Sequence, residues 1–181
     1  GGRSPALDLG CGSREDHPPV MEYTRPATWE DVKLIARHFA EAGVDYALVG
    51  GYALAAHGFS RFTEDIDVLV NPSADNARRW IAALAKLPDH AAAELAAEPD
   101  VFATDKLYAI RINDEITVDV MPSIAGHSWA DMVPHITTVD LDGGSFRLLD
   151  LEGLLKTKQG LRPKDQMDAA VLSAALEKMN R

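Results

Sequence analysis

Residues 49–70 have the sequence VGGYALAAHGFSRFTEDIDVLV, which joins four local patterns. A short apolar segment ends in Gly50-Gly51, and a segment of small residues with helical character follows. A polar loop then carries Arg61 and Thr63, and an extended segment closes the stretch at residues 65–70. This order predicts a strand, a glycine turn, a short helix, a loop and a second strand.

The second of these strands carries two carboxylates on one face. Side chains alternate across a strand, so Asp65 and Asp67 point to one side and the apolar residues between and after them point to the other. Residues 116–121 repeat this pattern around Asp119. Carboxylates on one sheet face repel one another and lose hydration, and a divalent cation relieves both penalties. Hard oxygen ligands of this kind suit Mg²⁺, so the pattern predicts a metal site.

Each of these features has a simpler structural interpretation. The aspartates could be solubilising residues on the wet face of an edge strand. Gly50-Gly51 could be a tight turn and nothing more. In the functional interpretation, the glycines let the backbone approach a phosphate, and amides at the start of the next helix donate to it.

The remaining pattern predicts a mixed α/β sheet flanked by helices, with a helical C-terminal end. We expect a flexible lead over residues 1–27, a core over 28–150 and a C-terminal helical segment, packed on the core, over 151–181. The expected strands are 46–49, 65–70, 107–112, 116–121, 136–141 and 145–148. The expected helices are 28–42, 52–57, 73–87, 128–133, 151–158 and 164–179, with a further helical turn or two over 91–97.

Composition narrows the class of protein. The 181 residues are 46% hydrophobic and 25% charged, which is ordinary for a globular domain. A single cysteine, Cys11, excludes an internal disulfide framework and a cysteine-based zinc site. The net charge of -10 argues against non-specific binding of duplex DNA. No apolar segment reaches the roughly 20 residues of a membrane helix, and no secretory signal pattern opens the chain, so the cytoplasm is the expected compartment.

One phrase near the N-terminus, Leu7-Asp-Leu-Gly-Cys-Gly-Ser13, resembles the glycine motif of S-adenosylmethionine-dependent methyltransferases. That motif needs a preceding strand and a following helix. Nothing before it builds a sheet, Arg14 replaces a small residue, and Pro18-Pro19 prevents the helix. We therefore expect no cofactor binding at this phrase.

Three motifs resemble those of the DNA polymerase beta superfamily of nucleotidyltransferases, in their minimal bacterial form. They are Val49-Gly50-Gly51, Asp65-Ile66-Asp67-Val68 and Val118-Asp119-Val120. The segments 58–67 and 154–168 are similar to abortive-infection-type toxins within that superfamily. The resemblance covers roughly residues 28 to 179, with the nucleotidyltransferase core at 28–150. It departs from many relatives at Gly51, where they have serine.

The resemblance implies a two-metal mechanism. Asp65 and Asp67 would ligate a Mg²⁺ ion that bridges the nucleotide phosphates, and Asp119 would join them at a second Mg²⁺ and help to activate an acceptor hydroxyl. A nucleoside monophosphate would pass from a nucleoside triphosphate to that hydroxyl, and pyrophosphate would leave. The residues assigned to the nucleotide are Gly50, Gly51, Arg61, Thr63, Lys158 and Arg162.

The sequence leaves the acceptor and the base preference open. The acceptor could be a small molecule, a protein side chain or the 3′ end of an RNA such as tRNA. One alternative is a toxin–antitoxin or phage-defence component that acts mainly through a protein partner, such as an antitoxin. Another is a non-catalytic relative that only binds nucleotide, although retention of all three carboxylates argues against it.

Overall fold

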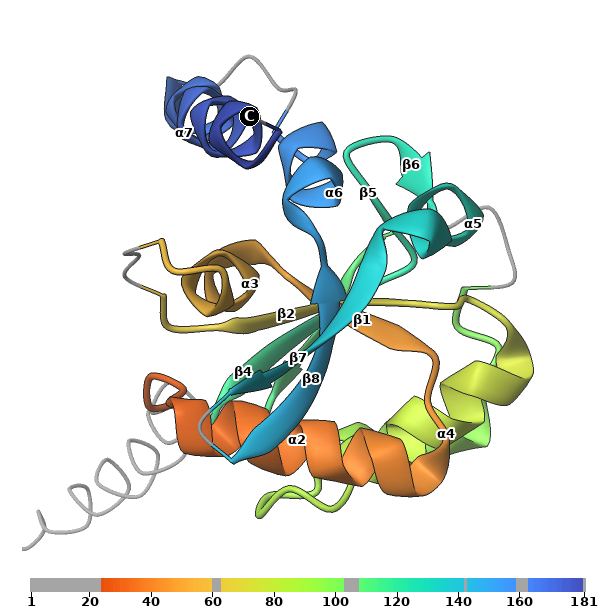
Figure 1. Cartoon of the computed structure of the whole chain (residues 1–181). Helices are drawn as coiled ribbons and strands as arrows, with labels where there is room; N and C mark the ends of the chain where they lie inside the picture. Colours follow the sequence, from red (N-terminus) through yellow and green to blue (C-terminus); the bar gives the residue numbers. More distant parts are fainter. Residues whose placement is uncertain (1–23, 60–62, 103–107, 142, 159–162, 181) are drawn as a thin grey trace, which may run out of the picture.

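A six-stranded mixed sheet forms the centre of the protein in a computed structural model that describes residues 24–59, 63–102, 108–141, 143–158 and 163–180 (Figure 1). Its strands are β1 (Tyr46–Val49), β2 (Ile66–Val70), β3 (Ile110–Asn113), β4 (Thr117–Met121), β7 (Ile136–Leu141) and β8 (Gly144–Leu149). The order across the sheet is β3-β4-β2-β1-β8-β7. β2 runs parallel to β4 and β1 runs parallel to β8, whereas the other neighbours are antiparallel. The predicted mixed α/β fold is confirmed.

Helices flank this sheet. They are α2 (Trp29–Ala42), α3 (Gly50–Ala56), α4 (Ala74–Leu84), α5 (Trp129–Met132), α6 (Leu151–Lys156) and α7 (Pro163–Met179), with 3-10 turns η2 (Ala91–Ala97) and η3 (Val133–His135). A small hairpin, β5 (Ser123–Ile124) and β6 (His127–Ser128), lies outside the main sheet. Figure 1 shows α2 and α4 together on one side of the sheet, with α3 and α6 away from them.

Local signals in the sequence explain where the helices begin and end. Thr28 forms a capping box with Asp31, since the Thr28 backbone N–H donates to the Asp31 carboxylate at 2.8 Å. Gly43 ends the same helix in a left-handed conformation, at φ +71°. Ser73 caps α4 by accepting a hydrogen bond from the backbone N–H of Asn76 at 3.2 Å.

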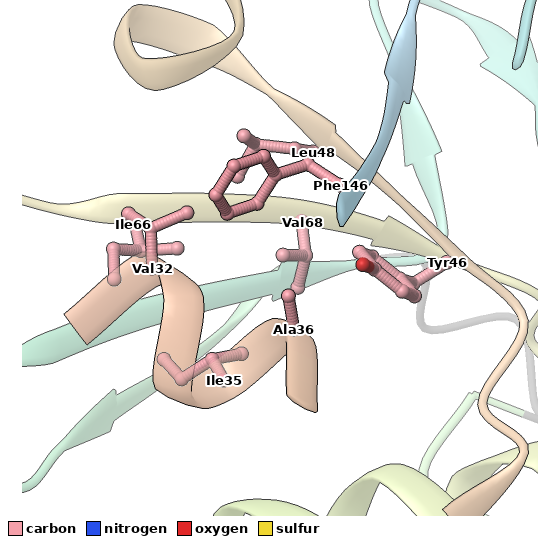
Figure 2. Close-up of a pocket in the computed structure, with 8 residues that line it drawn as sticks. All are labelled: Val32, Ile35, Ala36, Tyr46, Leu48, Ile66, Val68 and Phe146. Atoms are coloured by element: carbon pink, nitrogen blue, oxygen red, sulfur yellow. The ribbon is translucent and has the colours of Figure 1, made fainter. Parts of the chain in front are cut away.

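The main core lies between α2 and one face of the sheet. Figure 2 shows side chains of the helix directed toward side chains of β1, β2 and β8. The residues that meet there are Val32, Ile35, Ala36, Tyr46, Leu48, Ile66, Val68 and Phe146. Because Ile66 and Val68 of β2 face α2, alternation directs Asp67 to the opposite face of the sheet. The core thus fixes which way the carboxylates point.

Several predicted boundaries shift by a few residues. β2 begins at Ile66, so Asp65 lies immediately before the strand, and α3 begins at Gly50 because the glycines form its first turn. Residues 91–97 form a 3-10 helix, and α6 ends at Lys156, two residues early. Most of the predicted N-terminal lead, including the methyltransferase-like phrase, lies outside the described residues. No helix in the described part of the chain combines the length and apolarity of a membrane span.

Candidate active site

Three charged side chains lie in a row across the sheet. Parallel pairing of β2 and β4 sets Asp67 beside Asp119, and antiparallel pairing of β3 and β4 sets Arg111 on the other side of Asp119. Directly paired residues share a face, so the three side chains project to the same side, opposite to α2. We call Asp67, Asp119 and Arg111 the charged row. It forms because the strand register aligns residues that are distant in sequence.

The centre of the row is a pair of facing carboxyl groups. Those of Asp67 and Asp119 are close enough to share a hydrogen bond, and the Asp119 side chain is only 15% exposed. The pKa of Asp67 is raised to about 7. Burial is the largest cause, followed by the charge of Asp119, their shared hydrogen bond and the charge of Asp65. Arg111 opposes this shift in pKa. Without a metal ion, the pair therefore retains a proton near neutral pH.

Arg111 neutralises the outer end of the row. Its Nε donates to Oδ1 of Asp119 at 2.9 Å, and its Nη2 donates to Oδ2 at 3.1 Å. The same Nη2 lies 3.6 Å from Oδ2 of Asp65. Hydrogen bonding to Asp119 raises the pKa of Arg111. One guanidinium thus bridges two of the three predicted metal ligands.

Arg111 was not among the residues predicted for the site. In the structure the β3–β4 hairpin is centred on Glu115, so Arg111 and Asp119 lie four residues on either side of it and pair directly. The expected strands 107–112 and 116–121 are centred on Asp114 instead, and that register would have paired Arg111 with Thr117.

The glycine pair lies against the carboxylates. A Cβ atom at Gly50 would overlap Oδ2 of Asp67, and Gly50 has φ +71°, which side chains rarely adopt. A Cβ atom at Gly51 would lie 2.7 Å from Cβ of Thr63. Thr63 in turn donates from Oγ1 to the backbone carbonyl of Asp65 at 3.2 Å. Both glycines therefore permit the start of α3 to pack against β2 and the segment before it, beyond making a turn.

The predicted triphosphate-binding cations divide into two groups. Arg61 and Arg162 lie outside the described residues. Lys158 is 15% exposed, and its Nζ lies 3.3 Å from Oδ2 of Asp168 and 3.8 Å from Oδ1 of Asp165. These contacts join the end of the α6 segment to α7. The role of Lys158 in nucleotide binding stays a prediction.

The central carboxylate pair has the donor chemistry of a magnesium site. Mg²⁺ commonly takes one or two carboxylates and completes its shell with water and substrate phosphates. A cation also stabilises two facing carboxyls of this kind, because it favours the charged form of Asp67, whose pKa is raised. Among the described residues, no group of three or more His, Cys, Asp or Glu side chains is arranged to hold a metal ion. Asp67 and Asp119 fit Mg²⁺ as a pair, and Asp65 stays a predicted third ligand.

Comparisons with known proteins bear on this site. The family model described as nucleotidyl transferase AbiEii toxin, type IV TA system, matches residues 33–143, a segment that includes the whole charged row. No curated protein shows significant similarity to the chain.

Two solved structures match the chain. One is a protein of Thermotoga maritima, provisionally named a nucleotidyltransferase, with a TM-score of 0.53, 14% identity and coverage of 83% of this chain and 92% of that chain. The other is an antigenic nucleotidyltransferase-like protein from Paracoccidioides brasiliensis, with a TM-score of 0.46, 18% identity and coverage of 78% and 72%. The first shows that the fold is shared.

Proposed function

The chain belongs to the AbiEii nucleotidyltransferase toxin family, and on this premise we propose that it transfers a nucleoside monophosphate from a nucleoside triphosphate to an acceptor hydroxyl. The membership also confirms the resemblance predicted from the sequence motifs. The observation that carries the proposal is the pairing of Asp67 with Asp119 on neighbouring parallel strands, directly beside Gly50. Candidate acceptors are a small molecule, a protein side chain and an RNA 3′ end.

The proposed reaction is an in-line displacement at the α-phosphorus. The acceptor oxygen forms a bond to phosphorus, the bond to the bridging oxygen breaks, and pyrophosphate leaves. Asp67 and Asp119, with Asp65 as a third ligand, would hold Mg²⁺, and Asp119 would also help to activate the acceptor hydroxyl. When bound, Mg²⁺ supplies positive charge that stabilises the attacking and leaving oxygens.

The residues around the carboxylates would position the nucleotide. Gly50 and Gly51 let the start of α3 pack against Asp67 and Thr63, so phosphate oxygens held by the carboxylate-bound metal would lie beside this turn, and Thr63 fixes the segment that leads to Asp65. The further proposed triphosphate contacts are Arg61, Lys158 and Arg162. Among these, Lys158 would have to exchange its acidic neighbours for phosphate.

Nucleotide binding and transfer test this proposal. Thermal-shift assays with each of the four nucleoside triphosphates and Mg²⁺ identify the preferred nucleotide, and transfer of its labelled α-phosphate to cellular RNA, protein or small molecules identifies the acceptor. Asp67→Asn should reduce transfer on the order of 10³-fold while the protein stays folded, because several kcal/mol of charge stabilisation are lost. Asp140→Asn, on the solvent-exposed edge strand β7, is the matched control. Unchanged turnover in Asp67→Asn would overturn the proposal.

A second candidate function is action through a protein partner. The matched family is described as a toxin of type IV toxin–antitoxin systems, which motivates an antitoxin partner. Expression of wild type and Asp67→Asn in a host cell separates the two functions. Growth arrest by wild type alone favours catalysis, whereas equal arrest by both favours a partner-mediated effect. Nucleotide binding without transfer would favour a non-catalytic relative.

A further inference from the structure

We propose that Arg111 is an exchangeable counter-ion, which holds Asp119 and Asp65 in the metal-free protein and releases them when a divalent cation binds. The proposal rests on the proposed function, because it assigns a role to a residue beside the same carboxylates. It makes Arg111 a positioning residue that sets the affinity of the site for metal.

The contacts of Arg111 are those of a substitute cation. Its guanidinium reaches both oxygens of Asp119, at 2.9 and 3.1 Å, and lies 3.6 Å from Asp65. Among the described residues, the three carboxylates Asp65, Asp67 and Asp119 thus have one guanidinium, that of Arg111, as their cationic contact, and Asp67 faces Asp119 instead of a cation. An arginine stays charged in any such setting, so its positive charge always competes with an incoming metal ion.

The position of Arg111 also allows it to leave. β3 is an edge strand of the sheet, and the Arg111 side chain is 60% exposed although both of its acidic partners are less so. Hydrogen bonds at an exposed edge are readily exchanged with water, and the long side chain can turn outward without disturbing the core. The Asp119 carboxylate, by contrast, is fixed on β4 between two strands.

Two substitutions separate charge from hydrogen bonding. Arg111→Gln keeps a hydrogen-bond donor and removes the charge, whereas Arg111→Lys keeps the charge and removes the forked donor geometry. Removing a unit charge from the neighbourhood of a bound cation strengthens cation binding, and near a protein surface the effect reaches tenfold or more. The Gln variant should also be less stable to heat without metal, because its carboxylates lose their counter-ion.

The test measures Mn²⁺ binding to the full chain without nucleotide, by electron paramagnetic resonance of the free ion. We expect Arg111→Gln to bind Mn²⁺ about tenfold more tightly than wild type. Arg111→Lys should bind close to wild type, and Mn²⁺ should raise the melting temperature of Arg111→Gln more than that of wild type. Arg78→Gln, which removes an exposed charge paired with Asp75 on α4, is the matched control and should bind Mn²⁺ like wild type.

Each outcome decides the inference. Equal or weaker Mn²⁺ binding by folded Arg111→Gln overturns the counter-ion role and leaves the proposed function standing. Tighter binding by both Arg111→Gln and Arg111→Lys shows that contact geometry governs the effect, and this also overturns the role of charge. Absence of Mn²⁺ binding in every variant overturns the inference together with the metal dependence of the proposed function. Circular dichroism of each variant confirms that the folded state is being compared.

Discussion

Asp67 and Asp114 are both largely withdrawn from water beside the same sheet, but their carboxylates meet opposite partners. Asp114 is only 4% exposed and accepts hydrogen bonds from the backbone N–H groups of Asp89, Ala91 and Glu115, at 2.8, 2.9 and 2.8 Å. Its charge is satisfied by three donors that the fold supplies. Asp114 therefore joins the β3–β4 turn to the start of η2.

Asp67 instead faces a second carboxyl group, that of Asp119. Its pKa is raised to about 7, which means that the folded protein resists its ionisation. The more deeply buried aspartate is thus the one with ordinary structural partners. Burial alone does not distinguish a functional carboxylate from a structural one, whereas the identity of its nearest partners does.

The largest effect on stability is expected for substitution of Asp114, the structural carboxylate. Asp114→Ala leaves three backbone N–H groups without their acceptor, at a cost of roughly 1–3 kcal/mol each, so we expect a loss of about 4 kcal/mol in the free energy of unfolding. Asp114→Asn should lose less, because its amide oxygen still accepts. Urea denaturation measures both. Transfer activity per folded molecule should stay at the wild-type level. An Asp114→Ala variant that is stable but inactive would show that Asp114 has a functional role instead of a structural one.

Two glycines with the same backbone angle make it possible to separate backbone strain from displacement of the Asp67 carboxylate. Gly43 and Gly50 both have φ +71°, so alanine at either position costs roughly 1–2 kcal/mol of backbone strain. The added Cβ meets nothing within 4 Å at Gly43, but it overlaps the Asp67 carboxylate at Gly50. We expect Gly50→Ala alone to reduce kcat/KM by about a hundredfold, because displacing a catalytic group by about 1 Å has that effect.

Gly43→Ala supplies the control for strain. If Asp67 moves away from the added Cβ at Gly50, only backbone strain remains in both variants. Urea denaturation should then show similar losses in the free energy of unfolding. Equal kcat/KM in Gly43→Ala and Gly50→Ala would mean that the position of Asp67 does not matter for transfer.

Local patterns in the sequence were enough to predict one part of the site. Alternation along residues 65–70 placed Asp67 opposite to the apolar residues that pack on α2, and the structure shows this arrangement. Capping at Thr28 and Ser73 is equally local, and the two helices were predicted to begin at these residues. These features depend on neighbours within a few residues, which a sequence displays directly.

Features that depend on pairing between strands were harder to predict. Parallel pairing of β2 with β4 brings Asp67 beside Asp119. The repeated carboxylate pattern suggested that the two residues share a site, but no turn links the two strands, so their direct pairing could not be predicted from it. The position of Arg111 depends on the hairpin register, and the observed register differs by one residue in its centre from the one that the expected strands imply. The contacts of Lys158 with Asp165 and Asp168 depend on how α6 and α7 pack, which the charge pattern of a single helix does not determine.

The smallest expected effect is a pH dependence of stability that originates in Asp67. Its pKa is about 7 in the folded protein and near 3.8 when unperturbed, so the folded state binds the proton more tightly. The stability that this proton contributes is fully present below about pH 4 and is lost as the pH rises through about 7. Between pH 5 and pH 7 the loss amounts to about 2 kcal/mol in the absence of metal.

Asp67→Asn removes that titration, so its free energy of unfolding relative to wild type should rise by about 2 kcal/mol between pH 5 and pH 7. Urea denaturation in the presence of EDTA measures the difference, and Asp140→Asn should show no such trend. Parallel stability profiles for wild type and Asp67→Asn would mean that neither burial nor the charge of Asp119 raises the pKa of Asp67 in solution. In that case Asp67 and Asp114 would not differ in how well the fold accommodates their carboxyl groups.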